Sequence, residues 1–244
     1  DAIISGAGLP TELPKFAEGY NVALAPIVSS TKSANVILKF WDKKYHRTAD
    51  FLVIEGPLAG GHLGFSREQL EDIPSLDYDT EIQNIIALKQ TYEEKYQTTI
   101  PVFVAGGMFT AEDATHVMEL GADGIQAATR FVATEECDAS DAYKQAYVNA
   151  SDDDVIIIKS PVGMPGRAIK NAFIERMLAA PDKISHCFNC LKACNPVTAP
   201  YCITQALINA VVGDLDNGLI FCGSRVGEIK EITTVPKLMQ ELTV

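Results

Sequence analysis

The sequence predicts an α/β fold in which parallel strands alternate with helices. Short apolar runs end in Gly, Ser, Pro or Ala, and segments with helical spacing lie between them. Continuous apolar runs suit strands buried on both faces, and their alternation with helices implies parallel βαβ units. We expect strands at Ala2–Ser5, Val22–Val28, Phe51–Ile54, Ile100–Ala105 and Gly124–Ala128. We expect helices at Leu9–Gly19, Ser33–Lys44, Asp79–Tyr96 and Ala111–Leu120.

The ends of one helix are marked clearly in the sequence. Thr110 precedes Ala111-Glu112-Asp113, so its hydroxyl can cap a helix whose first turn is acidic, and Gly121 can close the same helix. This completes five strand–helix units before residue 135. Five parallel units fit either a doubly wound sheet or part of a (β/α)8 barrel, and periodicity alone does not choose between them.

The pattern changes after residue 136, where we expect a mostly helical extension that packs on the sheet. The chain therefore divides into a barrel portion, 1–136, and an extension, 137–244. The extension should contain a strand at Val155–Lys159 and a Gly/Pro-rich loop at Lys159–Arg167. Its helices are expected at Ala139–Ala150, Asn171–Ala180, Thr204–Val212 and Val235–Leu242.

Composition excludes several classes of protein. The 244 residues are 47% hydrophobic, which is too apolar for a disordered chain, and the apolar runs are far too short to span a membrane. The formal net charge of −12 gives no general attraction for nucleic acid or anionic lipid. No signal peptide follows Asp1, so we expect a cytoplasmic protein, and an opening without Met indicates that a further segment precedes it.

The richest motif runs from Glu55 to Gly64 and surrounds His62 with glycines directly after a buried strand. Sites in parallel α/β folds lie at the carboxyl ends of strands, and an imidazole there can act as acid, base or hydrogen-bond donor. The alternative is a turn histidine with no chemical role. We favour the catalytic interpretation of His62 because glycines let the backbone approach a flat ligand closely.

Two further strand ends are rich in small residues. Gly106 and Gly107 follow the expected strand Ile100–Ala105, and Ala128 and Thr129 end the next one. Neighbouring strand ends that present backbone N–H groups make an anion cradle, and barrels often hold a phosphate in this way. One Gly-Gly pair alone would mark only a tight turn. Neither a Walker loop nor a G-x-G-x-x-G motif opening a helix is present.

These motifs together resemble the nitronate monooxygenase family, formerly called 2-nitropropane dioxygenases. The resemblance rests on Ala59-Gly60-Gly61-His62, on Ala105-Gly106-Gly107, and on Leu120–Gly124 running into Ala128–Glu136. Flavin-dependent enoyl-acyl-carrier-protein reductases share the Gly-Gly-His and the architecture. The resemblance implies a (β/α)8 barrel that binds FMN. The cofactor-binding residues it implies are Gly61, Gly106, Gly107, Gln126, Ala128 and Thr129.

Two departures from the family pattern affect these expectations. About three strands that family members carry before the equivalent of Ala2–Ser5 are absent, and five strands cannot close a barrel. We therefore expect those strands on a preceding segment or on another chain. The phosphate turn usually reads Gly-Thr, whereas here it is Ala128-Thr129, and alanine restricts positive φ. The loop with Lys159, Ser160 and Arg167 is either a cover over the active site or a plain Pro/Gly turn.

A cysteine-rich segment has the spacing C-x2-C-x3-C-x7-C, formed by Cys187, Cys190, Cys194 and Cys202. Thiolates at this spacing can surround a zinc ion or an iron–sulfur cluster. The segment also resembles the cluster segment of some flavin-dependent dienoyl reductases, whose last spacer is longer. The alternative is a cysteine-rich turn with reduced, partly buried thiols and no metal. The resemblance favours this alternative, because many flavin barrels of the family have no metal.

The function predicted from these observations is FMN-dependent oxidation of nitronates or nitroalkanes by O2, with His62 beside the substrate. The second hypothesis is an enoyl-thioester reductase that uses NAD(P)H and FMN. A third, of another class, is an electron-transfer partner in which the cysteine segment holds iron–sulfur or zinc. The partners expected are a small-molecule substrate, O2 or NAD(P)H, and a second copy of the chain as a homodimer, without nucleic acid or membrane.

Overall fold

The computed structural model describes residues 1–190 and 194–243, and these residues fold into two compact units. The first unit comprises Asp1–Pro57 and Gly64–Ala127, together with the end of the chain from Leu242. The second unit comprises Leu58–Leu63 and Ala128–Glu241. The short segment around His62 therefore belongs to the second unit, although the strand before it belongs to the first.

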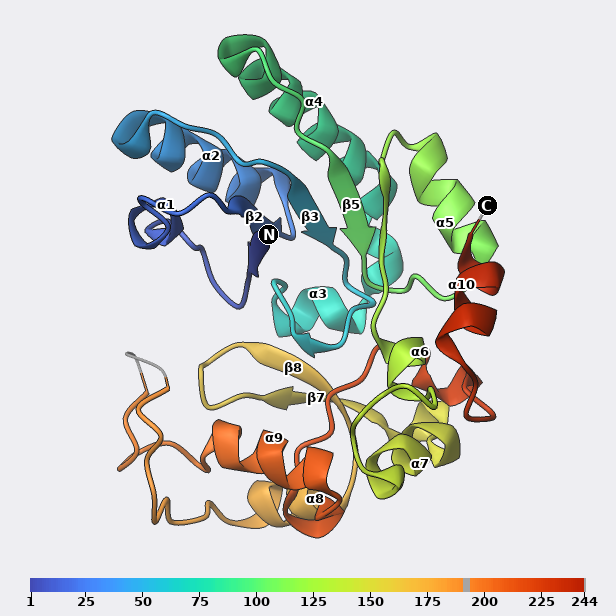
Figure 1. The fold of residues 1–244 in the computed structure, drawn as a ribbon. Coiled ribbons are helices and arrows are strands. Elements are labelled where there is room, and N and C mark those ends of the chain that lie inside the picture. Colours follow the sequence, from blue (N-terminus) through green and yellow to red (C-terminus); the bar gives the residue numbers. More distant parts are fainter. Residues whose placement is uncertain (191–193, 244) are drawn as a thin grey trace. The chain divides into compact units, whose positions relative to one another are not determined.

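The first unit is built on a parallel sheet of five strands, as the sequence predicts (Figure 1). The strand order is β1-β2-β3-β5-β6, and every neighbouring pair is parallel. The sequential order fits successive βαβ units. The strands are β1 (Ala2–Ser5), β2 (Ala23–Val28), β3 (Leu52–Glu55), β5 (Val102–Ala105) and β6 (Gly124–Gln126).

The predicted helices of the first unit are confirmed, and their ends follow the capping signals. Ser30 caps one helix and Thr110 another, each through a capping box with the residue three positions on. The first helix is shorter than predicted, because Pro14 stands at its start and it ends after one turn. The helices are α1 (Leu13–Phe16), α2 (Thr31–Tyr45), α3 (Arg67–Glu71), the 3₁₀ turn Ile73–Leu76, α4 (Tyr78–Tyr96) and α5 (Ala111–Glu119).

The core of the first unit lies between the sheet and helices α2 and α4, which run side by side in Figure 1. Trp41 of α2 is fully buried, and its indole N–H donates to the Pro10 carbonyl at 3.1 Å. The central strands β3 and β5 are apolar on both faces, whereas Ile3 and Ile4 of the edge strand β1 are 40% and 48% exposed. This gradient matches the burial expected inside and at the edge of a parallel sheet.

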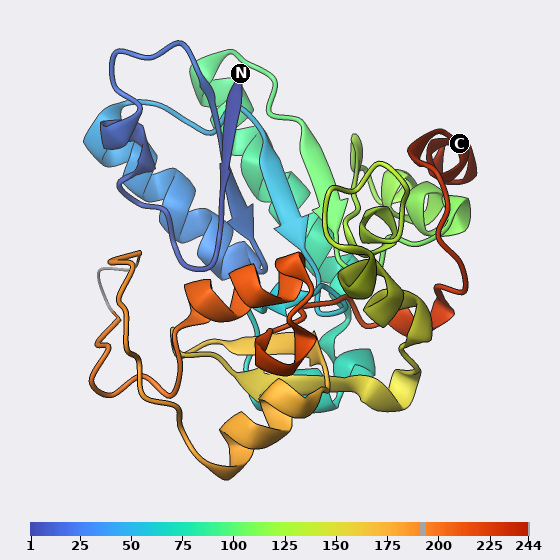
Figure 2. The same cartoon turned by 60° about the horizontal axis from the view of Figure 1, so that its bottom comes forward.

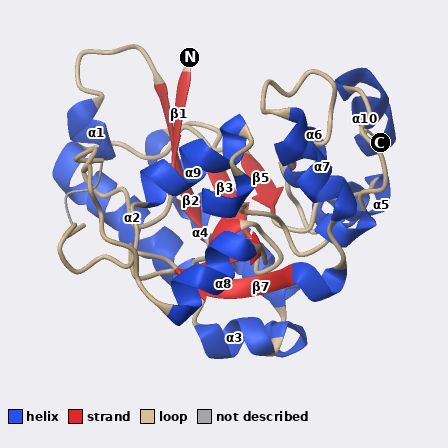
Figure 3. Ribbon diagram, turned by 90° about the horizontal axis from the view of Figure 1, so that it is seen from below, coloured by secondary structure: helices blue, strands red, loops and turns tan. Residues whose placement is uncertain are grey.

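The second unit contains a three-stranded antiparallel sheet of order β4-β8-β7. Its strands are β4 (Gly61–His62), β7 (Val155–Lys159) and β8 (Pro165–Ile169). Helices α8 (Ala172–Ala179) and α9 (Ile203–Val212) cover β7 and β8, as Figures 2 and 3 show, and share with them a core that includes Phe173, Tyr201 and Leu219. The other elements are α6 (Thr129–Val132), α7 (Asp141–Asn149), α10 (Val235–Leu242) and the 3₁₀ turns Asp152–Asp154, Leu215–Asn217 and Val226–Glu228.

The sequence-based prediction of a loop over Lys159–Arg167 is wrong at its end. The chain turns at Ser160 and then forms β8, which pairs with β7 on one side and with β4 on the other. Pro165 and Gly166 hide this strand from sequence analysis, because both residues are poor strand formers. Pro165 is tolerated because it is the first residue of the strand, where a missing N–H does little harm.

Within residues 1–190 and 194–243, no helix is long and apolar enough to cross a membrane.

The cap of α5 gives a test of the fold. Thr110→Ala removes the hydroxyl that accepts a hydrogen bond from the Asp113 backbone N–H. We expect the free energy of unfolding to fall by about 1 kcal/mol. Thr110→Ser keeps the hydroxyl and is the matched control. Urea unfolding followed by circular dichroism measures both variants, and equal stability of the two would contradict the role given to the cap.

Candidate functional site

His62 is held in place by a close approach between two backbones in the second unit. A Cβ added to Gly60 would lie only 2.5 Å from the carbonyl carbon of Cys222, so only glycine fits there. Gly61 has a φ of +67°, the left-handed region that other residues rarely adopt. Gly61 and His62 form β4, which pairs with β8. In this pairing Gly61 lies opposite Arg167 and His62 lies opposite Gly166.

The imidazole of His62 has two close neighbours from distant parts of the chain. Its Nε2 lies 2.7 Å from Ser160 Oγ, and its ring packs against the ring of Phe221 with centroids 5.2 Å apart at an interplanar angle of 65°. The side chain is half-buried, and this loss of water lowers the pKa of His62 below its usual 6.5. The neutral imidazole therefore prevails at neutral pH, which leaves one ring nitrogen free to accept a proton.

Ser160 is fixed by the turn that precedes β8. Its backbone N–H donates to the Met164 carbonyl at 3.0 Å, and its carbonyl accepts from the Gly163 N–H at 2.9 Å. The residue is only 3% exposed. A buried hydroxyl in a fixed turn orients the His62 ring in the same way that second-shell partners orient metal-binding or catalytic histidines. The turn therefore brings Ser160 into contact with His62, the residue that we predict to be catalytic.

Arg167 lies in β8, the strand that follows this turn, and is also buried, at 4% exposure. Its guanidinium donates a hydrogen bond to the Ala59 carbonyl, just before the two glycines. Burial lowers the pKa of Arg167 and raises the pKa of the neighbouring Cys222 thiol to about 12, so the thiol is neutral at physiological pH. Arg167 thus anchors the turn that contains Gly60 and Gly61. The sequence alone does not show this role.

Ala128 and Thr129 begin α6 in the second unit. Ala128 has φ −135°, so alanine in place of the usual glycine causes no backbone strain here. The Thr129 hydroxyl oxygen accepts a hydrogen bond from the Gly223 N–H at 2.9 Å. Its hydrogen is then left to donate to another group. Ala128 and Thr129 therefore keep the two groups that the expected phosphate turn requires, a backbone N–H and a hydroxyl.

In the first unit, the remaining predicted cofactor residues share one edge of the sheet. Ala105 pairs with Gln126 of β6, and Gly106 and Gly107 follow Ala105 with φ of +90° and +87°. Two consecutive glycines can adopt this left-handed conformation without strain, and neither carries a side chain. Gly106, Gly107 and Gln126 thus lie at neighbouring carboxyl ends of parallel strands, where α/β folds place their ligands.

Glu55 is a candidate that the sequence analysis did not single out. It ends β3 opposite Ala105, so it belongs to the same edge of the sheet. Burial raises the pKa of its carboxyl from 4.5 to about 7. Tyr78 fixes the backbone there, since its hydroxyl is placed to donate to the carbonyl of Glu55 at 2.9 Å or of Ser29 at 3.2 Å. An acid directly after a run of buried apolar residues was the signal available in the sequence.

The four cysteines of the predicted metal motif lie in the second unit and line one small cavity. Burial and the charges of the other three thiolates raise the pKa of Cys194. All six cysteines of the chain are free thiols. Among the described residues, however, no three His, Cys, Asp or Glu side chains are arranged so that they could hold a metal ion as they stand.

The raised pKa of Glu55 makes stability depend on pH. Between about pH 4.5 and 7 the folded protein keeps a proton on Glu55 that the unfolded chain releases, so stability falls as pH rises through this range. Glu55→Gln removes this group, and we expect the variant to lose less stability than the parent between pH 5 and pH 7.5. Urea unfolding at both pH values measures the difference. Glu18→Gln, at an exposed position, is the control, and parallel pH profiles for all three proteins would refute the assignment.

Comparison with known proteins gives a family match over the whole chain. The family model described as nitronate monooxygenase matches residues 1–244. A probable nitronate monooxygenase of Staphylococcus saprophyticus is 32% identical over 135 residues, which are 55% of this chain and 36% of that protein. One of Staphylococcus aureus is 30% identical over 128 residues, 52% of this chain and 34% of that protein. The matched part is therefore about a third of the length of these curated relatives.

Solved structures agree with this match. FabK from Thermotoga maritima superimposes with a TM-score of 0.70 at 25% identity, covering 99% of this chain and 66% of that one. Nitroalkane oxidase from Streptomyces ansochromogenes gives a TM-score of 0.65 at 21% identity, covering 99% and 62%. The second likeness shows the fold alone, that of the later part of a TIM barrel with its extension. With the family model matched from end to end, the chain belongs to the nitronate monooxygenase family.

Proposed function

We propose that this oxidoreductase converts alkyl nitronates, with FMN and molecular oxygen, to carbonyl compounds and nitrite. The family match supports the reaction class, and the observation that carries the proposal is the neutral, half-buried His62 held by Ser160. Nitronates are anions formed when a nitroalkane loses its α-proton. A neutral imidazole suits both forms of the substrate, because it can accept that proton or donate a hydrogen bond to the nitro oxygens.

The residues present fit an FMN phosphate. Gly106 and Gly107 carry no side chain and turn the backbone with φ of +90° and +87°, and Ala128 and Thr129 offer a backbone N–H and a hydroxyl hydrogen. Gln126 and Gly61 are the further residues we assign to the cofactor. Bound FMN would supply the electron transfer that amino-acid side chains cannot perform, while the protein positions substrate and cofactor.

The protein's own contribution to the reaction centres on proton transfer. A neutral nitroalkane must lose its α-proton, and His62 takes it on the ring nitrogen that carries no hydrogen. The resulting imidazolium is stabilised if its other N–H donates to Ser160 Oγ, which lies 2.7 Å from Nε2. The ring of Phe221 packs against the imidazole, with centroids 5.2 Å apart, and restricts its movement. On the strength of these contacts we assign His62 the role of base and Ser160 that of a positioning residue.

Removal of the base should affect two substrates differently. His62→Ala is expected to lower kcat/KM for neutral nitroalkanes by roughly 100-fold or more, because only these need proton removal. The kcat/KM for preformed nitronates should fall much less. Nitrite release under air measures both rates. His116→Ala, which changes an exposed histidine paired with Asp79, is the control. Equal losses for the two substrates would refute the base role.

The phosphate assignment can be tested through the hydroxyl of Thr129. Thr129→Val is expected to weaken FMN binding by roughly tenfold or more, since a hydrogen bond to a charged group contributes about 1.5–3 kcal/mol. Thr129→Ser keeps the hydroxyl and should bind FMN like the parent. Quenching of FMN fluorescence gives the dissociation constants. If valine and serine variants bind FMN equally, Thr129 does not hold the phosphate.

An enoyl-thioester reductase is the second candidate function. One observation favours it: among these structural relatives FabK has the higher TM-score, and an enoyl reductase domain of MlnA from Bacillus amyloliquefaciens shares the fold at a TM-score of 0.63 and 13% identity. This reaction would need NAD(P)H and no oxygen. Anaerobic NAD(P)H oxidation that depends on an enoyl thioester, without nitrite release from nitronates in air, would decide for it.

A further inference from the structure

The cysteine-rich segment of the second unit has a feature that FMN chemistry does not use. Cys187, Cys190, Cys194 and Cys202 are spread over sixteen positions, yet all four line the same cavity of about 90 Å³. None of them forms a disulfide. The other lining residues include Ile184, Phe188 and Ile203, so the four sulfurs are the chemically reactive groups of an otherwise largely apolar hollow.

The backbone around the first two cysteines already donates to sulfur. The Asn189 N–H lies 3.4 Å from Cys187 Sγ and donates a hydrogen bond to it. Asn189 has φ +51°, so the chain turns between Cys187 and Cys190 in a way that aims this N–H at the sulfur. The Cys187 thiol in turn donates to Asn189 Oδ1 at 3.6 Å. Backbone N–H groups aimed at sulfur are also found around metal–thiolate sites, where they tune the metal.

Cys202 approaches the cavity from a rigid element. It is the N-cap residue of α9, a helix of ten residues. Tyr201, beside it, is buried at 6% exposure and packs edge-on against Phe173 with centroids 5.1 Å apart. Cys202 is therefore anchored to the core, whereas Cys187 and Cys190 are exposed on a segment without helix or strand.

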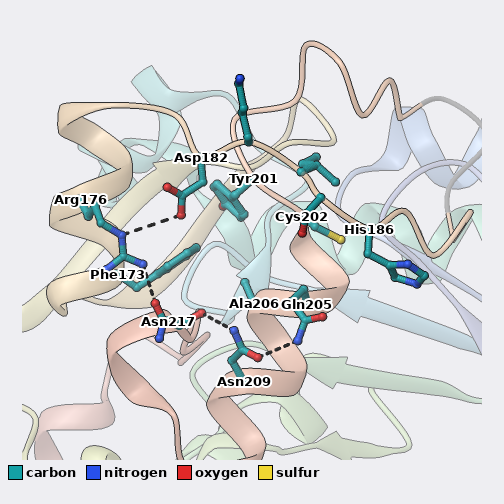
Figure 4. Close-up of a pocket in the computed structure, with 13 residues that line it drawn as sticks. Phe173, Arg176, Asp182, His186, Tyr201, Cys202, Gln205, Ala206, Asn209 and Asn217 are labelled. Carbon is teal, nitrogen blue, oxygen red and sulfur yellow. Dashed lines mark hydrogen bonds and ion pairs between the residues drawn. The ribbon is translucent and has the colours of Figure 1, made fainter.

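A neighbouring cavity is lined on one side by Cys202, at the start of α9, and on another by His186, which lies on a segment without helix or strand. In Figure 4 the sulfur of Cys202 points toward the side of the cavity where His186 lies, and Arg176 on the other side is paired with Asp182 and Asn217. The segment before Cys187 thus ends beside the helix that carries Cys202. Because the described residues do not yet place three ligands around one point, a bound ion would have to draw the exposed cysteines toward Cys202.

We propose that Cys187, Cys190, Cys194 and Cys202 bind one zinc ion as a tetrahedral four-thiolate site. Zinc accepts four thiolates in closed structural sites, with spacings that begin with two to four residues between ligands, and its charge offsets the repulsion among the sulfurs. The ion would tie the segment that carries Cys187 and Cys190 to the start of α9. Its role would be structural, because such a site leaves no open position for a substrate. The inference does not depend on FMN.

The first test needs no variant. The protein, purified under reducing conditions without chelators, is expected to contain one zinc per chain by mass spectrometry of its metals. Four fewer thiols should react with an alkylating reagent than after the zinc is removed. Cobalt(II) in place of zinc should give the thiolate charge-transfer and visible bands of a tetrahedral site. Metal-free protein with all thiols reactive, or a mass two hydrogens lower from a disulfide, would overturn the proposal.

Variants then assign the ligands. Cys187→Ser and Cys194→Ser should each weaken zinc binding at least tenfold in competition with a chromophoric chelator, since even second-shell losses cost 10–100-fold. Cys137→Ser, a half-buried cysteine outside this cavity, should bind zinc like the parent. The His186→Ala variant should also bind zinc like the parent. Loss of zinc from this variant would overturn the assignment of four thiolates as the ligands. Iron with acid-labile sulfide in place of zinc would overturn the zinc assignment in favour of a cluster.

Discussion

The parallel register of β3, β5 and β6 is the constraint on which the first unit depends. Hydrogen bonding places Glu55 opposite Ala105 and Ala105 opposite Gln126, so the three strands end at the same level. Whatever follows each strand is then presented at one edge of the sheet. Our proposal that Gly106 and Gly107 bind the cofactor depends on this register, which places them and Glu55 at the same end of the sheet as Gln126.

In the second unit, antiparallel pairing brings residues that are distant in the sequence next to each other. His62 and Ser160 are 98 positions apart, and they meet because β4 and β7 flank the same strand β8. Gly60 and Gly61 permit this, one by its contact with the Cys222 backbone and the other by its positive φ. Burial then sets the chemistry, since the loss of water keeps the His62 imidazole neutral and the Cys222 thiol protonated.

The family assignment and the local geometry support each other at different levels. The match over residues 1–244 gives the family, while the contacts of His62 support our proposal for how this chain handles a proton. The cysteine segment stands apart from both. Its thiols are placed by the N-terminus of α9 and by a single turn at Asn189, and a metal there would stabilise the extension rather than take part in oxidation.

The sequence by itself determined the five parallel strands, the longer helices and the glycine-flanked His62, because apolar periodicity and capping are local signals. The short helices α3 and α6 were not predicted. It also indicated the four cysteines through their spacing. Tertiary structure alone decided the rest. Strand β8 contains Pro165 and Gly166 and forms only through pairing with β7 and β4. The Ser160 contact and the raised pKa of Glu55 arise from burial and from neighbours distant in the chain, which no local pattern encodes.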